Sequence, residues 1–235
     1  KKEQKKLSET HQRISIGIIK RLDENLERLN NNINCLKDDT VFRAFQLANT
    51  AMLIQIIISN DNHFSKVEKE VSEINDLTEY DTLSFFANYD YSRIPFEPRY
   101  RPFQLAFLLL SLKGVVEPQS VDRKEIVDLI WFPTGGGKTE AYLAVTAFTI
   151  AYRRLANEEK LSNGVSVIMR YTLRLLTAQQ FERSSKLISA LEFLRKNFID
   201  ELKTEPISIG LWVGNQVTPG KIEDAVNHID ELERA

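Results

Sequence analysis

The feature that most constrains this chain is the stretch 131–139, which reads Trp-Phe-Pro-Thr-Gly-Gly-Gly-Lys-Thr. A short apolar segment, 128–130, precedes it, and good helix formers, 140–144, follow it. This order predicts a strand, a glycine-rich turn and a helix, which is the context that a phosphate-binding loop requires. Glycines let backbone N–H groups turn toward a phosphate, and the N-terminus of the following helix adds partial positive charge.

Each residue of the loop has an expected role in binding ATP. The cradle is formed by Thr134, Gly135, Gly136, Gly137, Lys138 and Thr139. Lys138 would reach the β- and γ-phosphates as the catalytic point charge, and the Thr139 hydroxyl would ligate Mg²⁺. Phe132 stands where the strict pattern G-x-x-x-x-G-K-[ST] has its first glycine, which disfavours kinases and small GTPases. The alternative is an ordinary glycine turn before a helix.

Composition describes an ordinary soluble chain of one or two domains. Of its 235 residues, 43% are hydrophobic and 27% are charged, and the net charge of −2 means that nucleic acid would need a local basic patch. Cys35 is the single cysteine, so an intrachain disulfide is impossible and a cytoplasmic location is expected. The apolar run 51–58 is short and interrupted by Gln55, which indicates a buried helix and no membrane span. No initiator Met is present, so we expect a fragment or a processed form.

The first part of the chain, 1–96, is expected to be a helical N-terminal domain that ends in an aromatic linker. Apolar residues recur every three or four positions between Ile14 and Ile33, which predicts an amphipathic helix. A second helix, about 41–59, is apolar on most faces and is expected at the centre of a bundle. The aromatic segment 80–100 would pack irregularly and join the two domains, with base stacking as the less favoured interpretation.

The second part, 97–235, alternates predicted helices and strands. Arg-Pro-Phe-Gln at 101–104 opens a helix expected to end at Gly114. After the loop we expect the following elements: a helix over 138–156, a strand over 164–169, a long helix to about 197, a strand over 207–214 and a last helix after Pro219. This alternation predicts an α/β fold with a parallel sheet.

The loop and the Arg-Pro-Phe-Gln segment together resemble superfamily-2 helicases, and 101–214 is similar to the first RecA-like domain of that family. The resemblance implies that Gln104 reads the adenine edge, since an amide can donate and accept at once. The alternative is a helix start with no ligand.

The same resemblance implies a nucleic-acid track after the second and third strands. The residues it assigns to that track are Arg170, Arg174, Thr177, Trp212 and Gly214. Arginine and hydroxyl donors there would contact backbone phosphates. The alternatives are a solvated face for the arginines and core packing for Trp212.

Longer strings are similar to the helicase subunit of DISARM-type phage-defence systems. They are FPTGGGKTEAYL, MRYTLRLLTAQQFERS and ISIGLWVGN, and AFQLANTAMLIQ at 44–55 is similar to that family's helical leader. The resemblance implies an ATP-dependent DNA helicase or translocase of a bacterial phage-defence system. It would use ATP and Mg²⁺ and bind other defence subunits through its N-terminal helices. The alternatives are a nucleotide-gated scaffold that does not unwind DNA, and an unrelated phosphotransferase, which Phe132 disfavours.

One expected helicase element has no counterpart in the sequence. Motif II, an apolar strand that ends in Asp-Glu, does not follow the third predicted strand, and Asp230-Glu231 falls in the predicted last helix. A second RecA-like domain is absent too. We therefore expect a partial sheet, an N-terminal piece of a larger motor, and little ATP hydrolysis by this piece alone.

Overall fold

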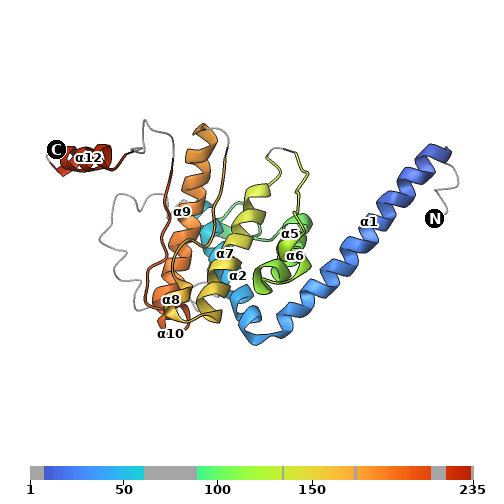
Figure 1. Cartoon of the computed structure of the whole chain (residues 1–235), viewed down its shortest axis with the longest axis horizontal. Helices are drawn as coiled ribbons and strands as arrows, with labels where there is room; N and C mark the ends of the chain where they lie inside the picture. The colour runs from blue at the N-terminus through green and yellow to red at the C-terminus, as the bar shows by residue number, and fades with distance from the viewer. Residues whose placement is uncertain (1–7, 61–88, 134, 172–173, 213–220, 234–235) are drawn as a thin grey trace.

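The computed structural model describes residues 8–60, 89–133, 135–171, 174–212 and 221–233, and every regular element in these ranges is helical (Figure 1). The elements are α1 (Glu9–Ile33), η2 (Asn34–Lys37), α2 (Asp39–Asn60), η5 (Tyr91–Arg93), α5 (Pro102–Val116), α6 (Val121–Lys124), α7 (Lys138–Ala156), α8 (Glu159–Ser162), α9 (Arg174–Asn197), α10 (Ile199–Leu202) and α12 (Ile222–Glu233).

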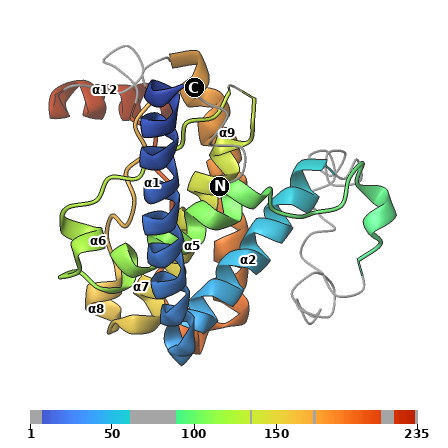
Figure 2. The ribbon, with the colours of Figure 1, turned by 90° about the vertical axis from the view of Figure 1, so that its right-hand side faces the viewer.

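The body of the molecule is a bundle of α2, α5, α7 and α9. In this bundle α2 packs against α7 and α9, and α7 also packs against α5 (Figure 2). Alanines at turn spacing on α2 and α7, among them Ala44, Ala48, Ala144 and Ala147, are fully or almost fully buried. Small side chains let two helix backbones approach closely, and the larger Phe148 and Leu191 then fill the remaining core.

Helix α2 is long and apolar enough to cross a membrane by length and composition, but half of its most apolar window is buried inside the molecule. Ala51, Ile54 and Ile57 are buried in the shared core. The interpretation of 51–58 as a buried helix is therefore confirmed, as is the helical character of the N-terminal region.

The starts of α1 and α2 follow from local capping. The Ser8 hydroxyl accepts a hydrogen bond from the His11 N–H at 3.5 Å, and Asp38 Oδ1 accepts one from the Val41 N–H at 3.0 Å. The predicted stop at Gly114 is wrong, because α5 continues to Val116. Val115 and Val116 pack against the core, and that burial outweighs the helix-terminating preference of glycine.

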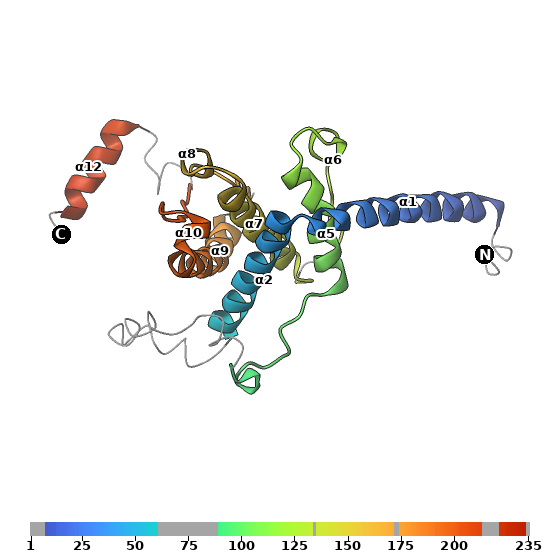
Figure 3. The ribbon, with the colours of Figure 1, turned by 90° about the horizontal axis from the view of Figure 1, so that it is seen from below.

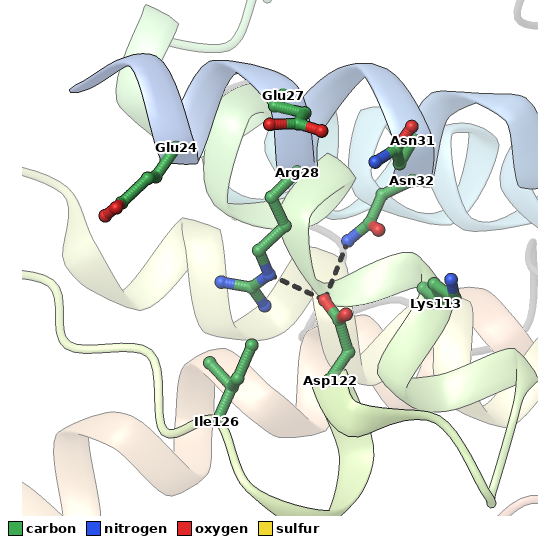
Figure 4. Close-up of a pocket in the computed structure, with 8 residues that line it drawn as sticks. All are labelled: Glu24, Glu27, Arg28, Asn31, Asn32, Lys113, Asp122 and Ile126. Atoms are coloured by element: carbon green, nitrogen blue, oxygen red, sulfur yellow. Dashed lines mark hydrogen bonds and ion pairs between the residues drawn. The ribbon is translucent and has the colours of Figure 1, made fainter. Parts of the chain in front are cut away.

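Helix α1 extends away from the bundle and is anchored near its C-terminal end (Figure 3). Arg28 Nε donates to Asp122 Oδ2 at 2.6 Å, and Arg28 Nη1 donates to Asp128 Oδ1 at 2.5 Å. Asn32 Nδ2 donates to the same Asp122 oxygen at 3.2 Å and to the Leu110 carbonyl at 2.7 Å. Arg28, Asn32 and Asp122 line a pocket of about 270 Å³ between α1, α5 and α6 (Figure 4).

The predicted parallel sheet, and with it the RecA-like α/β class, is wrong for the described part of the chain. The three expected strands, 128–130, 164–169 and the described residues of 207–214, are irregular extended segments. Side chains that a sheet would cover are open to solvent: Leu129 is 80% exposed, Ile168 is 79% exposed and Trp212 is 87% exposed.

These segments are held by helix side chains instead of by neighbouring strands. Arg153 of α7 donates to the Leu161 carbonyl at 3.2 Å and to the Val165 carbonyl at 2.8 Å. The Ile207 N–H donates to Glu192 Oε2 of α9 at 2.8 Å. A strand exists only through hydrogen bonds to another strand, so an apolar extended segment bonded to side chains stays irregular.

The domain division at 96/97 stays a prediction. Helix α2, from the first proposed domain, shares one core with α7 and α9 from the second. The first part of the aromatic linker, to residue 88, lies outside the described residues, and 89–100 is irregular apart from η5. Asp230-Glu231 lies within α12, as expected from the sequence.

Candidate nucleotide site

The glycine-rich loop lies between an extended segment that ends at Pro133 and the first residue of α7, Lys138. Gly135 has a φ of +76° and Gly137 a φ of +85°, which side-chain-bearing residues rarely adopt. A Cβ on Gly136 would lie 2.5 Å from the Phe132 ring and 2.9 Å from the Pro133 carbonyl. Each of these three positions therefore requires glycine. Thr134 lies outside the described residues.

The first turn of α5 supports the loop from beside it. Gln104 Oε1 accepts a hydrogen bond from the Arg101 N–H at 2.7 Å, and Gln104 Nε2 donates to the Gly137 carbonyl at 2.7 Å. Arg101 Nη1 donates to the Gly136 carbonyl at 2.8 Å. Both ends of the buried Gln104 amide are thus engaged with protein, and its contact with adenine stays a prediction.

Lys138 is turned back onto the loop that precedes it. Its Nζ donates to the Phe132 carbonyl at 2.7 Å and to the Pro133 carbonyl at 3.0 Å. A phosphate would compete for this ammonium group, because hydrogen bonds between ionised partners are about twice as strong as neutral ones. The Lys138 ammonium group is therefore held at the loop.

Phe132, the residue in place of the first glycine, has a packing role. Its ring stacks on Phe103 of α5 with centroids 4.3 Å apart and planes at 20°. The same ring lies over Gly136. Phe132 therefore fixes the start of the loop against α5.

Glu140, in the first turn of α7, connects the loop to α9. Its Oε1 forms an ion pair with Arg183 Nη2, while its Oε2 is buried and has no hydrogen-bond partner among the described residues. A Cβ on Gly137 would lie 3.3 Å from this second oxygen, so the carboxylate faces the loop. Burial lowers the pKa of the Arg183 guanidinium.

Four residues of this arrangement were not assigned a role from the sequence: Arg101, Phe103, Glu140 and Arg183. The sequence contains a feature that could have pointed to three of these residues. Arg101 and Phe103 belong to the Arg-Pro-Phe-Gln segment, and Glu140 directly follows Lys138-Thr139. The Arg183 contact joins residues 43 positions apart in different helices, so no local pattern could reveal it.

The residues expected to bind nucleic acid are only partly described. Arg170 is exposed at the end of an extended segment, and Trp212 is exposed and lies outside the core of the described part. Arg174 and Thr177 lie in the first turn of α9, but their side chains, like the whole of Gly214, are outside the described part. The N-terminal ends of α7 and α9 lie at the same end of the bundle (Figure 1).

The donors around the loop fit Mg²⁺ bound together with a nucleotide. Thr139 follows Lys138 and is half-buried, and the unpartnered Glu140 oxygen faces the same loop. Oxygen donors of this kind suit Mg²⁺, which keeps several waters and is shared with substrate phosphates. The residues that the structure describes contain no group of three His, Cys, Asp or Glu side chains suited to a metal without such phosphates.

The described part of the chain is thus a helical bundle in which a glycine-rich loop leads into the first residue of α7. A scan against protein-family models finds none that matches this chain. The chain is 39% identical, over 224 residues, to the DISARM protein DrmA of Bacillus paralicheniformis. The match covers 92% of this chain but 18% of that protein's length. The chain is therefore DISARM-related over nearly all of its length and corresponds to a small part of that relative.

Proposed function

We propose that this chain is the ATP-binding part of a DNA helicase or translocase that acts in phage defence. The observation that carries the proposal is the loop itself, in which Gly135 and Gly137 adopt positive φ directly before Lys138 and the start of α7. The 39% identity to a DISARM protein supports a role of this chain in a defence system.

In this proposal, the loop and the start of α7 bind the phosphates of ATP. The first N–H groups of a helix have no partner within the helix, and its dipole favours an anion there. Lys138 would exchange the Phe132 and Pro133 carbonyls, now at 2.7 and 3.0 Å, for phosphate oxygens. Gln104 and Arg101 would hold Gly137 and Gly136 in the receptive conformation through their hydrogen bonds to the two carbonyls.

Thr139 is the residue proposed to ligate Mg²⁺, with Glu140 able to accept a hydrogen bond from a water of its shell. When bound, the ion neutralises charge on the β- and γ-phosphates. The task of this chain is to place the hydroxyl of Thr139 and the ammonium of Lys138 on the same side of the loop, which consecutive positions at a helix start achieve.

DNA is proposed to bind through Arg170, Arg174 and Thr177, at or just before the start of α9, and through Trp212 and Gly214. Glu140 and Arg183 join the first turn of α7 to α9, so the ATP loop and the DNA-contacting residues are linked by one ion pair. Contacts to phosphates make such binding indifferent to base sequence. A cytoplasmic location and defence-subunit partners for the N-terminal helices are part of the same proposal.

The direct test is ATP binding by the complete protein that carries this chain, with Lys138→Ala as the variant. We expect ATP affinity to fall by at least about tenfold, because a charge-assisted contact is worth about 1.5–3 kcal/mol. The fold should persist, since the Lys138 ammonium donates to two carbonyls of the loop itself. Lys124→Ala, on the short α6, is the matched control and should bind ATP normally. Unchanged affinity in Lys138→Ala would contradict the site.

A second function is favoured by one observation, the exposed apolar face of α1. A nucleotide-gated scaffold would use such a face to bind partners and would bind ATP and DNA without unwinding. ATP turnover separates the two: the motor hydrolyses ATP continuously in the presence of DNA, and the scaffold binds ATP without turnover.

A further inference from the structure

Helix α1 presents an apolar face that the bundle does not cover. It is tied to the body through Arg28 and Asn32, and the turns before them extend into solvent (Figures 1 and 3). Ile14, Ile18, Leu22 and Leu26 recur at steps of four residues and are 50–61% exposed. Each such step rotates by about 40° around the helix, so these side chains form one slowly turning stripe.

The two edges of this stripe carry opposite charges. Arg21 lies on one edge, about 100° from Leu22. Asp23 and Glu27 lie on the other edge, about 100° from Leu22 and Leu26 respectively. Lys20 and Glu24 lie on the opposite face of the helix, where they form their own ion pair at 3.8 Å. The stripe therefore has a basic edge and an acidic edge.

We propose that α1 pairs, in parallel, with α1 of a second copy of this chain, through Ile18, Leu22 and Leu26. In a parallel pair the two-fold axis runs along the helices, so the basic edge of one copy meets the acidic edge of the other. Arg21 then faces Asp23 of the second copy with an axial offset of about 3 Å, twice per dimer. An antiparallel pair would bring the basic edges together and the acidic edges together, which is unfavourable.

The same symmetry leaves room for both bodies. The body of each copy is attached through Arg28, which lies about 160° around the helix from Leu26 and therefore behind the stripe. The two-fold axis then places the second body on the opposite side of the helix pair. A membrane surface is the weaker occupant, because helices that bind anionic lipid carry basic residues along their polar face, whereas one edge here is acidic. The proposal is independent of the nucleotide site.

The first test is the mass of the complete protein by sedimentation velocity over a range of concentrations. We expect a concentration-dependent dimer, which Leu22→Glu weakens by at least about tenfold because two leucines leave the interface. Lys20→Ala, on the opposite face of the same helix, is the matched control and should dimerise normally. Both side chains are exposed, so thermal unfolding of the body should not change.

A charge exchange tests the parallel orientation. Arg21→Asp alone and Asp23→Arg alone should each weaken the dimer. Either substitution places two like charges opposite each other, at residues 21 and 23, at both contacts between the two helices. The double variant, Arg21→Asp with Asp23→Arg, should restore it. A monomer at all concentrations, a dimer indifferent to Leu22→Glu, or a double variant no tighter than the single ones would overturn the proposal and assign the stripe to another segment or partner.

Discussion

At the scale of single residues, Gly137 has two constraints that both exclude a side chain. Its φ is +85°, and a Cβ would lie 2.8 Å from Gln104 Nε2, which donates to the Gly137 carbonyl. We expect Gly137→Ala to lower ATP affinity by about tenfold or more, since backbone strain of this kind costs about 1–3 kcal/mol. Titration of a fluorescent ATP analogue into the complete protein measures the effect.

Gly17→Ala is the matched control for that substitution. A Cβ on Gly17, within α1, meets nothing within 4 Å. ATP affinity should stay at the wild-type value, and α1 should gain up to about 1 kcal/mol of helix stability. If Gly137→Ala binds ATP as tightly as Gly17→Ala does, the loop conformation is not the one that binds phosphate.

The sequence was sufficient to place the glycine loop immediately before a helix, because glycines and helix formers act locally. It was insufficient to show how the loop is held. The hydrogen bond between Gln104 and Gly137, the stack of Phe103 on Phe132 and the Glu140–Arg183 pair all join residues distant in sequence. Such contacts depend on how helices pack, which periodicity does not specify.

At the scale of elements, α1 is attached to the bundle by charges. Breaking a buried ion pair by removing one partner costs about 3–5 kcal/mol. We expect Asp122→Asn to lower the free energy of unfolding by about 3 kcal/mol. This value is at the low end of that range because Arg28 retains its ion pair with Asp128. Urea unfolding at neutral pH measures the loss. Asp200→Asn, on the short α10, is the control and should unfold like the wild type.

The contribution of Asp122 should disappear in acid. Burial alone would raise the pKa of Asp122, but hydrogen bonds from Arg28 and Asn32 outweigh it and hold the pKa below its ordinary value of 3.8. Stability from a lowered carboxylate pKa is fully present above that ordinary value and is lost as pH falls through the folded pKa. The wild type should therefore approach Asp122→Asn in stability below about pH 4. A difference that persists unchanged in acid would contradict this anchor.

The sheet was predicted wrongly for a reason that also lies at this scale. Apolar runs such as 164–169 and 207–212 suit a strand, but a strand needs a neighbour for its backbone hydrogen bonds. Here Arg153 and Glu192 supply those bonds from helices. The helices were predictable because their hydrogen bonds are internal and their capping residues, Ser8 and Asp38, are adjacent in sequence.

At the scale of the whole molecule, the proposal links the loop before α7 to α9 through the Glu140–Arg183 ion pair. If Arg174 contacts a DNA phosphate, Arg174→Ala should lower the magnitude of the log K versus log salt slope by roughly 0.7 on single-stranded DNA. ATP affinity without DNA should not change. The measurement is a salt titration with two unrelated DNA sequences, and Arg99→Ala, in the segment before α5, is the control. A loss confined to one sequence would remove Arg174 from the track.

The most direct test of the account is ATP hydrolysis by the complete protein, with and without single-stranded DNA, beside its Lys138→Ala variant. The account predicts phosphate release that DNA stimulates in the wild type and that is abolished in Lys138→Ala, while both proteins unfold at the same temperature. Hydrolysis by Lys138→Ala at the wild-type rate would place ATP chemistry elsewhere. ATP binding by the wild type without any turnover would identify a scaffold instead of a motor.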